Sequence, residues 1–295
     1  MRKFQIFLIV TALSFLLSAS MKVVTTYPYI ADITSKIGGN EVEVFSLGSG
    51  NWDPHFVVPR PSFIVKLHKA DLLIINGAQI EIGWLPPLIS QAGNPNIQPG
   101  GKGFLDLSSA VELIDVPTSV SRDQGDVHSE GNPHFILDPH NVQAVALAIT
   151  NKLCDLDSAH SSFYQNGYES FTKVLNEKLR SWDEKLLPLS GTKIIEYHRL
   201  FDYFAKRYHL RILGTIEPLP GIPPYSRYIE GLIRLVKNEN AKMIFQDVYH
   251  SDSSARFISQ NTGIPVITIP HDVLSIKEAK DIFALYDEVV RRIAR

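Results

Sequence analysis

The two halves of the chain repeat one pattern, in which short apolar runs alternate with longer amphipathic segments. Runs rich in Val, Ile and Leu predict buried strands, and apolar residues spaced three or four positions apart predict helices. Strands of the first half are expected at 22–26, 42–47 and 72–75, with shorter fragments near Phe104 and Val111. Helices are expected between them at 29–37, 61–69 and 82–92. This alternation predicts a β/α lobe with a mostly parallel sheet.

The second half follows the same pattern. Its strands are expected at 193–196, 211–216, 242–245 and 266–269. Its helices are expected at 200–208, at 226–237, between Asp252 and Gly263, and at 276–293. Two further helices, at 141–153 and 158–187, separate the halves, and the second is long enough to act as a rigid connector. We therefore expect an α/β fold with an N-terminal lobe at 21–157, a connecting helix at 158–188 and a C-terminal lobe at 189–295.

The N-terminal segment has the features of an export signal. Arg2 and Lys3 precede an apolar run at 6–17, and the small residues at 18–20 suit a cleavage site. The run is shorter than the ~20 residues that span a bilayer comfortably. We expect a cleaved signal peptide at 1–20 and a periplasmic protein, and no cysteine near the cleavage site offers a lipid attachment point. The alternatives are an uncleaved anchor or a chain that begins at Met21.

Composition excludes several classes of protein. The formal net charge is -2, which gives no basic face, so we expect no nucleic-acid partner. Cys154 is the only cysteine, which excludes an intramolecular disulfide and any Cys-rich zinc or iron–sulfur site. The chain has no Gly-rich loop followed by Lys-Ser or Lys-Thr, so it is not the ATP-hydrolysing subunit of a transporter.

Three histidines stand at places where rigid turns or strand ends present them. His55 and His134 each follow a proline, which restricts the backbone around them, and His198 follows the strand predicted at 193–196. Ligands of open α/β sheets bind beyond the carboxyl ends of the strands. Two lobes that face each other across a cleft would therefore bring these imidazoles together as metal ligands.

A carboxylate from the second half would complete the site. Asp247 and Asp272 each follow a predicted strand there. Three nitrogens and one oxygen in a tetrahedral arrangement suit zinc, whereas manganese prefers more oxygen ligands. The remaining side chains considered are expected to have structural or solvated roles: His68, His128, His140, His160, His209 and the helix-capping Glu81.

Taken together, these segments resemble the metal-binding solute-binding proteins of ABC importers, the family called cluster A-I or cluster 9. The similar segments are Asp53-Pro54-His55, Asn132-Pro133-His134 with Leu137-Asp138-Pro139, Tyr197-His198 with Phe201 and Tyr203-Phe204-Ala205, Gly214 to Pro218, and Pro220 to Pro224. The resemblance covers essentially the whole chain after residue 20. It implies two lobes joined by a long helix, a single metal held between them by His55, His134 and His198, and delivery of that metal to a membrane permease.

The resemblance also guides the choice of the fourth ligand. In several relatives an aspartate after the last strand coordinates the metal, and Asp272 is similar in position. We prefer Asp272 and keep Asp247 and His271 in reserve. The zinc-handling branch often has a long His-rich loop, which is reduced here to 126–128, so zinc and manganese both remain open.

We therefore expect a monomeric periplasmic protein that captures a divalent metal, Zn²⁺ in the first instance, for an ABC importer and catalyses no reaction. A Mn²⁺-specific binding protein of the same family is the main alternative. A zinc-dependent hydrolase would need an open coordination position for water, which four protein ligands would not leave. A binding protein for a larger ligand, such as a metal chelate, would need a wide cleft lined by aromatic residues such as Tyr27, Trp52 and Tyr197.

Overall fold

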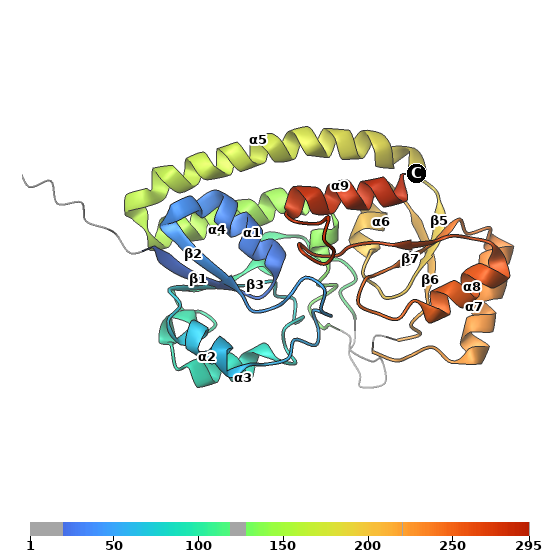
Figure 1. Cartoon of the computed structure of the whole chain (residues 1–295), viewed down its shortest axis with the longest axis horizontal. Coiled ribbons are helices and arrows are strands. Elements are labelled where there is room, and N and C mark those ends of the chain that lie inside the picture. The colour runs from blue at the N-terminus through green and yellow to red at the C-terminus, as the bar shows by residue number, and fades with distance from the viewer. Residues whose placement is uncertain (1–19, 119–127, 220, 295) are drawn as a thin grey trace, which may run out of the picture.

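The computed structural model describes residues 20–118, 128–219 and 221–294, and these residues form two α/β lobes (Figure 1). Each lobe contains a four-stranded parallel sheet, with strand order β2-β1-β3-β4 in the first and β6-β5-β7-β8 in the second. The strands of the first sheet are β1 (Met21–Thr25), β2 (Val42–Ser46), β3 (Leu72–Ile75) and β4 (Phe104–Asp106). Those of the second are β5 (Lys193–Glu196), β6 (Arg211–Thr215), β7 (Met243–Gln246) and β8 (Val266–Thr268). The predicted fold class is confirmed.

Helices cover both faces of the first sheet. They are α1 (Pro28–Gly38), α2 (Pro61–His68), α3 (Leu85–Ala92) and α4 (Asn141–Leu156). Figure 1 shows α1 and α4 on one face of the sheet and α2 and α3 on the other. Pro28 and Pro61 occupy the first turns of α1 and α2, where the missing N–H has no partner to lose.

The second sheet is covered in the same way. Its helices are α6 (Asp202–Tyr208), α7 (Ser226–Glu239) and α8 (Ser253–Thr262). The buried residues of α7 and α8 pack with Ile195 and Ile244 of the sheet, whereas α6 packs with Ile194 and Phe245. Because consecutive strand residues point to opposite faces, this division places α6 on one side of the sheet and α7 and α8 on the other.

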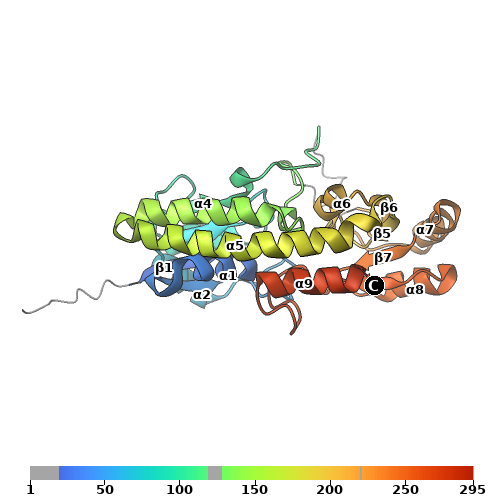
Figure 2. The ribbon, with the colours of Figure 1, turned by 90° about the horizontal axis from the view of Figure 1, so that it is seen from above.

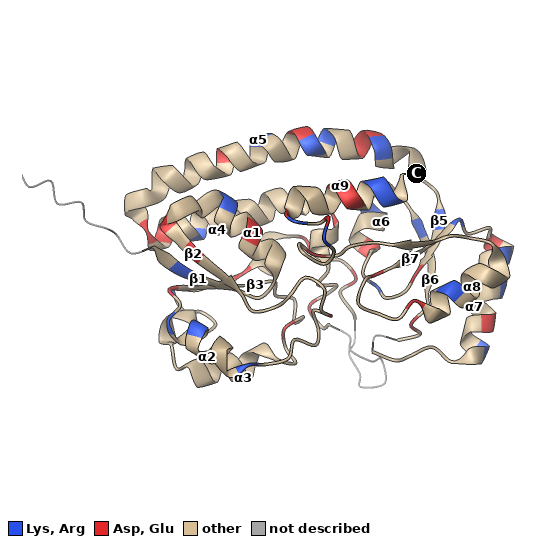
Figure 3. Ribbon diagram, in the orientation of Figure 1, with Lys and Arg blue, Asp and Glu red and all other residues tan. Residues whose placement is uncertain are grey.

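A long helix, α5 (Ser161–Leu186), links the lobes above both sheets (Figures 1 and 2). Its buried face presents Phe171, Leu175, Leu179 and Trp182, which recur at helical spacing. The last helix, α9 (Ile282–Ile293), returns along α5, and the Trp182 indole donates to Asp287 of α9 at 2.9 Å. Figure 3 shows most of the acidic and basic residues of these two helices toward their C-terminal ends. The apolar core therefore continues from the first lobe to the C-terminal helix.

Several predicted boundaries are wrong, and a tertiary contact and a local turn explain two of them. The last helix begins at Ile282 rather than at 276, because Asp281 caps it by accepting from the Ala284 N–H and the Ile282 N–H donates to Asp32 of α1. Helix α3 begins at Leu85 rather than at 82, after a turn in which Ala78 and Gln79 have positive φ. No strand forms near Val111, and 107–110 form a short 3-10 helix instead.

None of the helices in the described part of the chain is long and apolar enough to cross a bilayer. The predicted signal peptide at 1–20 lies outside the described residues, apart from Ser20.

Candidate metal centre

Three loops bring the predicted histidines together between the lobes. His55 lies in the loop that follows β2, and His198 lies two residues after β5. His134 precedes the 3-10 helix Phe135–Leu137 in the first lobe. The Asn132 side chain accepts from the His134 N–H at 2.9 Å and donates to the Arg199 carbonyl at 2.9 Å. One asparagine therefore holds the His134 loop against the His198 loop.

The three imidazoles have the geometry of a metal site. Among the described residues, His55, His134 and His198 form a group whose ligand atoms all lie within 4.8 Å of one another. Their ring centroids are 5.2–5.3 Å apart and their planes are inclined by 70–85°. A metal at ~2.1 Å from each nitrogen in tetrahedral geometry would separate the nitrogens by about 3.4 Å. A small contraction of the group would therefore enclose an ion.

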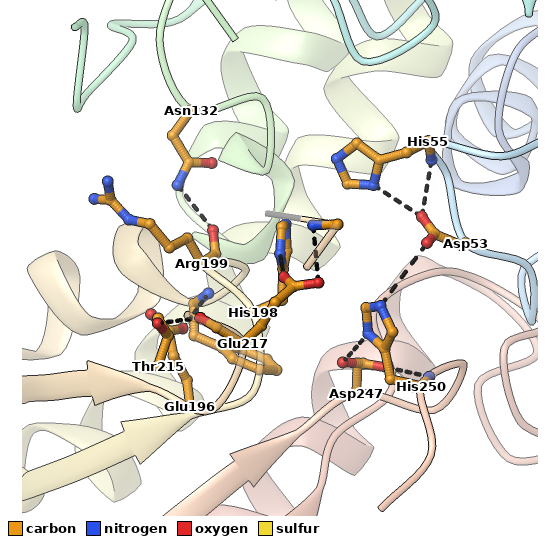
Figure 4. Close-up of polar contacts among 12 residues, drawn as sticks. Asp53, His55, Asn132, Glu196, His198, Arg199, Thr215, Glu217, Asp247 and His250 are labelled. Atoms are coloured by element: carbon orange, nitrogen blue, oxygen red, sulfur yellow. Dashed lines mark hydrogen bonds and ion pairs between the residues drawn. The ribbon is translucent and has the colours of Figure 1, made fainter. Parts of the chain in front are cut away.

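Carboxylates behind two of the rings determine which nitrogen faces the centre. The Nδ1 of His55 lies 2.8 Å from Asp53 Oδ1, and the Nδ1 of His198 lies 2.6 Å from Glu217 Oε2 (Figure 4). Each carboxylate holds a proton on Nδ1 and leaves Nε2 free to bind a metal. The Nε2 atoms of His55 and His134 are buried and have no hydrogen-bond partner among the described residues. Unpartnered buried nitrogens that converge in this way are the signature of an ion site.

The surroundings of the site keep a ligand imidazole neutral and place an ionised carboxylate behind another. Burial, with the neighbouring His55 and His198, holds the pKa of His134 well below its usual value, so this ring stays neutral and able to coordinate. Burial would raise the pKa of Asp53, but its hydrogen bonds and charge interaction with His55 lower it overall. Asp53 is therefore ionised, and its charge strengthens the electron donation of the His55 ring.

Asp272, the predicted fourth ligand, lines the same small cavity as His134 and is 5% exposed. Its Oδ1 accepts from the Tyr29 N–H at 2.8 Å and from the Val273 N–H at 2.6 Å. Burial raises the pKa of Asp272 well above its usual range, against the opposing effect of these two hydrogen bonds. Asp272 is outside the group of three histidines, and its role as a ligand stays a prediction.

Of the two reserve ligands, Asp247 is engaged elsewhere. Asp247 Oδ1 accepts from the backbone N–H of Tyr249 and of His250, and its Oδ2 lies 2.9 Å from the Nδ1 of His250. The His271 ring packs edge-on against Tyr249, and its Nδ1 is buried without a partner among the described residues. Burial lowers the pKa of His271 to about 4.

One histidine that the sequence analysis assigned to solvent lies beside the cluster. The His128 ring stacks on His55 with centroids 5.2 Å apart, and its Nε2 is buried without a partner in the described part of the chain. Burial, with the nearby His55 and His198, lowers its pKa to about 3. Nothing in the local pattern around His128 predicts this placement, because it depends on a contact with a distant loop.

Three of the other side chains that the sequence analysis set aside have structural partners. His140 contacts Asp183 of α5 at 3.0 Å, and His160 contacts Asp157 at 2.7 Å. Glu81 is buried and does not cap α3. It accepts from the Thr26 hydroxyl and from the Asn76 and Gly77 N–H groups, so it shapes the loop after β3. Burial raises its pKa to about 7.

Comparisons with known proteins identify the family of the chain. The family model described as "Zinc-uptake complex component A periplasmic" (ZnuA) matches residues 23–295. The metal ABC transporter substrate-binding lipoprotein SloC of Streptococcus mutans is 26% identical over 251 residues, which cover 83% of this chain and 79% of SloC. The manganese ABC transporter substrate-binding lipoprotein PsaA of Streptococcus pneumoniae is 26% identical over 256 residues, which cover 83% and 78%.

Solved structures share the fold. A zinc-bound deletion mutant of ZnuA has a TM-score of 0.75 at 24% identity and covers 94% of this chain and 99% of its own. The Mn-bound periplasmic metal-binding protein of Candidatus Liberibacter asiaticus has a TM-score of 0.77 at 18% identity and covers 93% and 98%. The family consists of solute-binding transporter components, which gives no support to a hydrolase. The chain belongs to the ZnuA family, and it is an extracytoplasmic metal-binding component of an ABC transporter.

Proposed function

We propose that the protein captures Zn²⁺ in the periplasm and delivers it to the membrane permease of its ABC transporter. The observation that supports zinc is the convergence of three imidazoles, two of them held by carboxylates on the Nδ1 side. Imidazole ligands suit zinc, whereas manganese favours sites rich in carboxylate, carbonyl and water oxygens. Zinc needs little reorganisation here, because two of the three Nε2 atoms are already buried without partners among the described residues.

Asp272 is our proposed fourth ligand, with His55, His134 and His198. The two backbone N–H groups on Oδ1 hold the carboxylate in place, and we assign Oδ2 to the metal. A dication would favour the charged carboxylate that burial disfavours, so zinc binding should release a proton from Asp272. Asp247 is the weaker choice, because both of its oxygens already accept hydrogen bonds.

Manganese is the competing cargo. The manganese-named PsaA is 26% identical to this chain and the zinc-bound ZnuA variant is 24% identical, so similarity does not distinguish the two metals. Purification without added metal, followed by measurement of metal content and competition between the two ions, is the decisive experiment. We expect one zinc per chain, which excess Mn²⁺ does not displace. Displacement of zinc by equimolar Mn²⁺ would overturn the choice of zinc.

Alanine variants test the ligand set. His55→Ala, His134→Ala and His198→Ala should each weaken zinc binding severely, because each leaves the shell incomplete. His209→Asn is a suitable control, since His209 is exposed at the end of α6 in a left-handed conformation that asparagine tolerates. Asp272→Ala should weaken binding more than Asp247→Ala. A larger loss of zinc binding in Asp247→Ala than in Asp272→Ala would identify Asp247 as the fourth ligand.

The remaining features of our proposal concern the context of the protein. We propose that residues 1–20 are removed on export and that the mature chain is a monomer without a lipid anchor. Arg2, Lys3 and the apolar run at 6–17 support export. We divide the mature chain into lobes at 21–157 and 189–295, with 158–188 as the connecting helix. The N-terminal mass of protein recovered from the periplasm, and its size in solution, test these assignments.

A further inference from the structure

A side chain of the second lobe contacts the carboxylate that orients a metal ligand of the first lobe. His250 lies in the loop between β7 and α8, and its Nε2 is 3.9 Å from Oδ2 of Asp53. The other oxygen of Asp53 is the one that lies 2.8 Å from Nδ1 of His55. Figure 4 shows the resulting row of side chains, which runs from His55 through Asp53 and His250 to Asp247.

His250 is held rigidly on its own lobe. Its Nδ1 lies 2.9 Å from Oδ2 of Asp247, whose side chain is fully buried. The other oxygen of Asp247 accepts from the backbone N–H of His250 at 2.7 Å, so ring and backbone share one anchor. The ring also stacks on Tyr197, with centroids 4.4 Å apart. The His250 ring, held by Asp247 and stacked on Tyr197, can therefore be a fixed partner for a group that approaches from the other lobe.

The distance between His250 and Asp53 can shorten when a metal binds. A separation of 3.9 Å is an ion-pair distance and is too long for a hydrogen bond. An ion bound by His55 and His198 would hold their nitrogens, which lie within 4.8 Å of each other, about 3.4 Å apart. His55 and Asp53 belong to one loop of the first lobe, while His198 and His250 follow adjacent strands of the second. The same contraction that encloses the ion can therefore bring Asp53 onto His250.

We propose that His250 is a positioning residue that holds Asp53, and through it His55, in the metal-bound arrangement of the lobes. The inference rests on the proposed function, since it requires a metal at the three histidines. His250 does not touch the ion. It slows metal loss by keeping the first-lobe ligand in place, as outer-shell partners of ligating histidines do.

The main test is the rate of zinc loss to an excess of chelator. His250→Asn is the variant to use, because asparagine can still donate to Asp247 but is too short to reach Asp53. Its control is His160→Asn, which alters another His–Asp pair with the same three-residue spacing, at 2.7 Å and away from the metal site. Outer-shell substitutions typically cost ~10–100-fold in metal affinity. We expect a rise of that size in the dissociation rate for His250→Asn and no change for His160→Asn.

A double-mutant cycle with Asp53→Asn separates this role from a general loss of stability. If His250 acts through Asp53, the double variant should lose zinc no faster than the worse single variant. Independent effects, which multiply the two rate increases, would overturn the proposal, as would a His250→Asn rate within twofold of wild type. Melting of the metal-free variants establishes that each is folded. Failure of the wild-type protein to bind one zinc would instead overturn the proposed function, before His250 is considered.

Discussion

Glu217 should control zinc affinity without touching the ion, and Glu217→Gln tests this. Its Oε2 lies 2.6 Å from Nδ1 of His198, and its Oε1 accepts from the Gly221 N–H at 2.9 Å. Both side chains of the His198–Glu217 pair are under 10% exposed, at 8% and 6%. Glutamine has one acceptor oxygen for these two donors and carries no charge. The variant therefore loses one of the two hydrogen bonds and the negative charge behind the ligand.

The structure sets the size of the effect. A metal ~2.1 Å beyond Nε2 would lie roughly 6–7 Å from the Glu217 carboxylate. At that distance and an effective dielectric constant of about 20, the attraction is about 2.5 kcal/mol per unit of metal charge. This energy is an upper limit for the loss of binding free energy in Glu217→Gln. The His198 ring can still coordinate the metal, and one hydrogen bond of residue 217 can persist. Outer-shell substitutions typically cost 10–100-fold, so we expect zinc affinity to fall by about 100-fold, or about 2.7 kcal/mol.

The assay is a competition titration against a chelating dye, with Glu230→Gln as the control. Glu230 is exposed on α7, so its substitution removes the same charge without a contact to a ligand. The metal-free melting temperature of each variant establishes that the fold is intact. Affinity within twofold of wild type for Glu217→Gln would refute the argument that this carboxylate orients and charges His198.

Three further predictions concern stability. Gly167→Ala should destabilise the protein by about 1–3 kcal/mol, because its new Cβ would lie 2.3 Å from the Ile37 carbonyl oxygen where α5 crosses α1. Gly231→Ala, on an open helix position, should instead be neutral or stabilising in the same denaturation experiment. In metal-free protein, His271 has a folded-state pKa of about 4, below its usual 6.5, so the unfolded chain binds more protons and stability falls as pH drops below 6.5. Between pH 6.5 and 5, the free energy of unfolding of His271→Gln should fall by about 1–2 kcal/mol less than that of the wild-type protein. Identical dependence of stability on pH in variant and wild type would contradict this prediction. Zinc at a thousandfold excess over Kd should add about 4 kcal/mol to the free energy of unfolding and raise the melting temperature by several degrees, and a chelator should reverse the shift.

Local pattern was sufficient for most of the fold. The apolar periods of the chain predicted every strand of both sheets, and they predicted α5 to within a few residues. Errors occurred where a distant residue decides the local backbone. The start of α9 depends on Asp32 of α1, which lies 250 positions away in sequence, and no window around 276–282 contains that information.

The histidine cluster was predictable for a different reason. His55 and His198 follow strands of two different parallel sheets, and ligands bind beyond the carboxyl ends of such strands, so each histidine was expected at the cleft edge of its own lobe. His134 was predicted from its proline and from resemblance, and the structure places it with the other two. The partners behind the rings were not predicted, because Glu217 and His250 reach the site by contacts that cross between strands or between lobes.

The sequence by itself therefore determined the order of the elements, the parallel character of the sheets and the identity of three converging imidazoles. These follow from local periodicity, from strand ends and, for His134, from the preceding proline and the family resemblance. Only the tertiary structure decided the protonation and surroundings of the site. The Nδ1 partner of His198, the stacking of His128 on His55 and the hydrogen bond from Tyr29 to Asp272 all join distant segments through contacts. Burial and hydrogen bonding set the charge of each group, and both arise only when distant segments pack together.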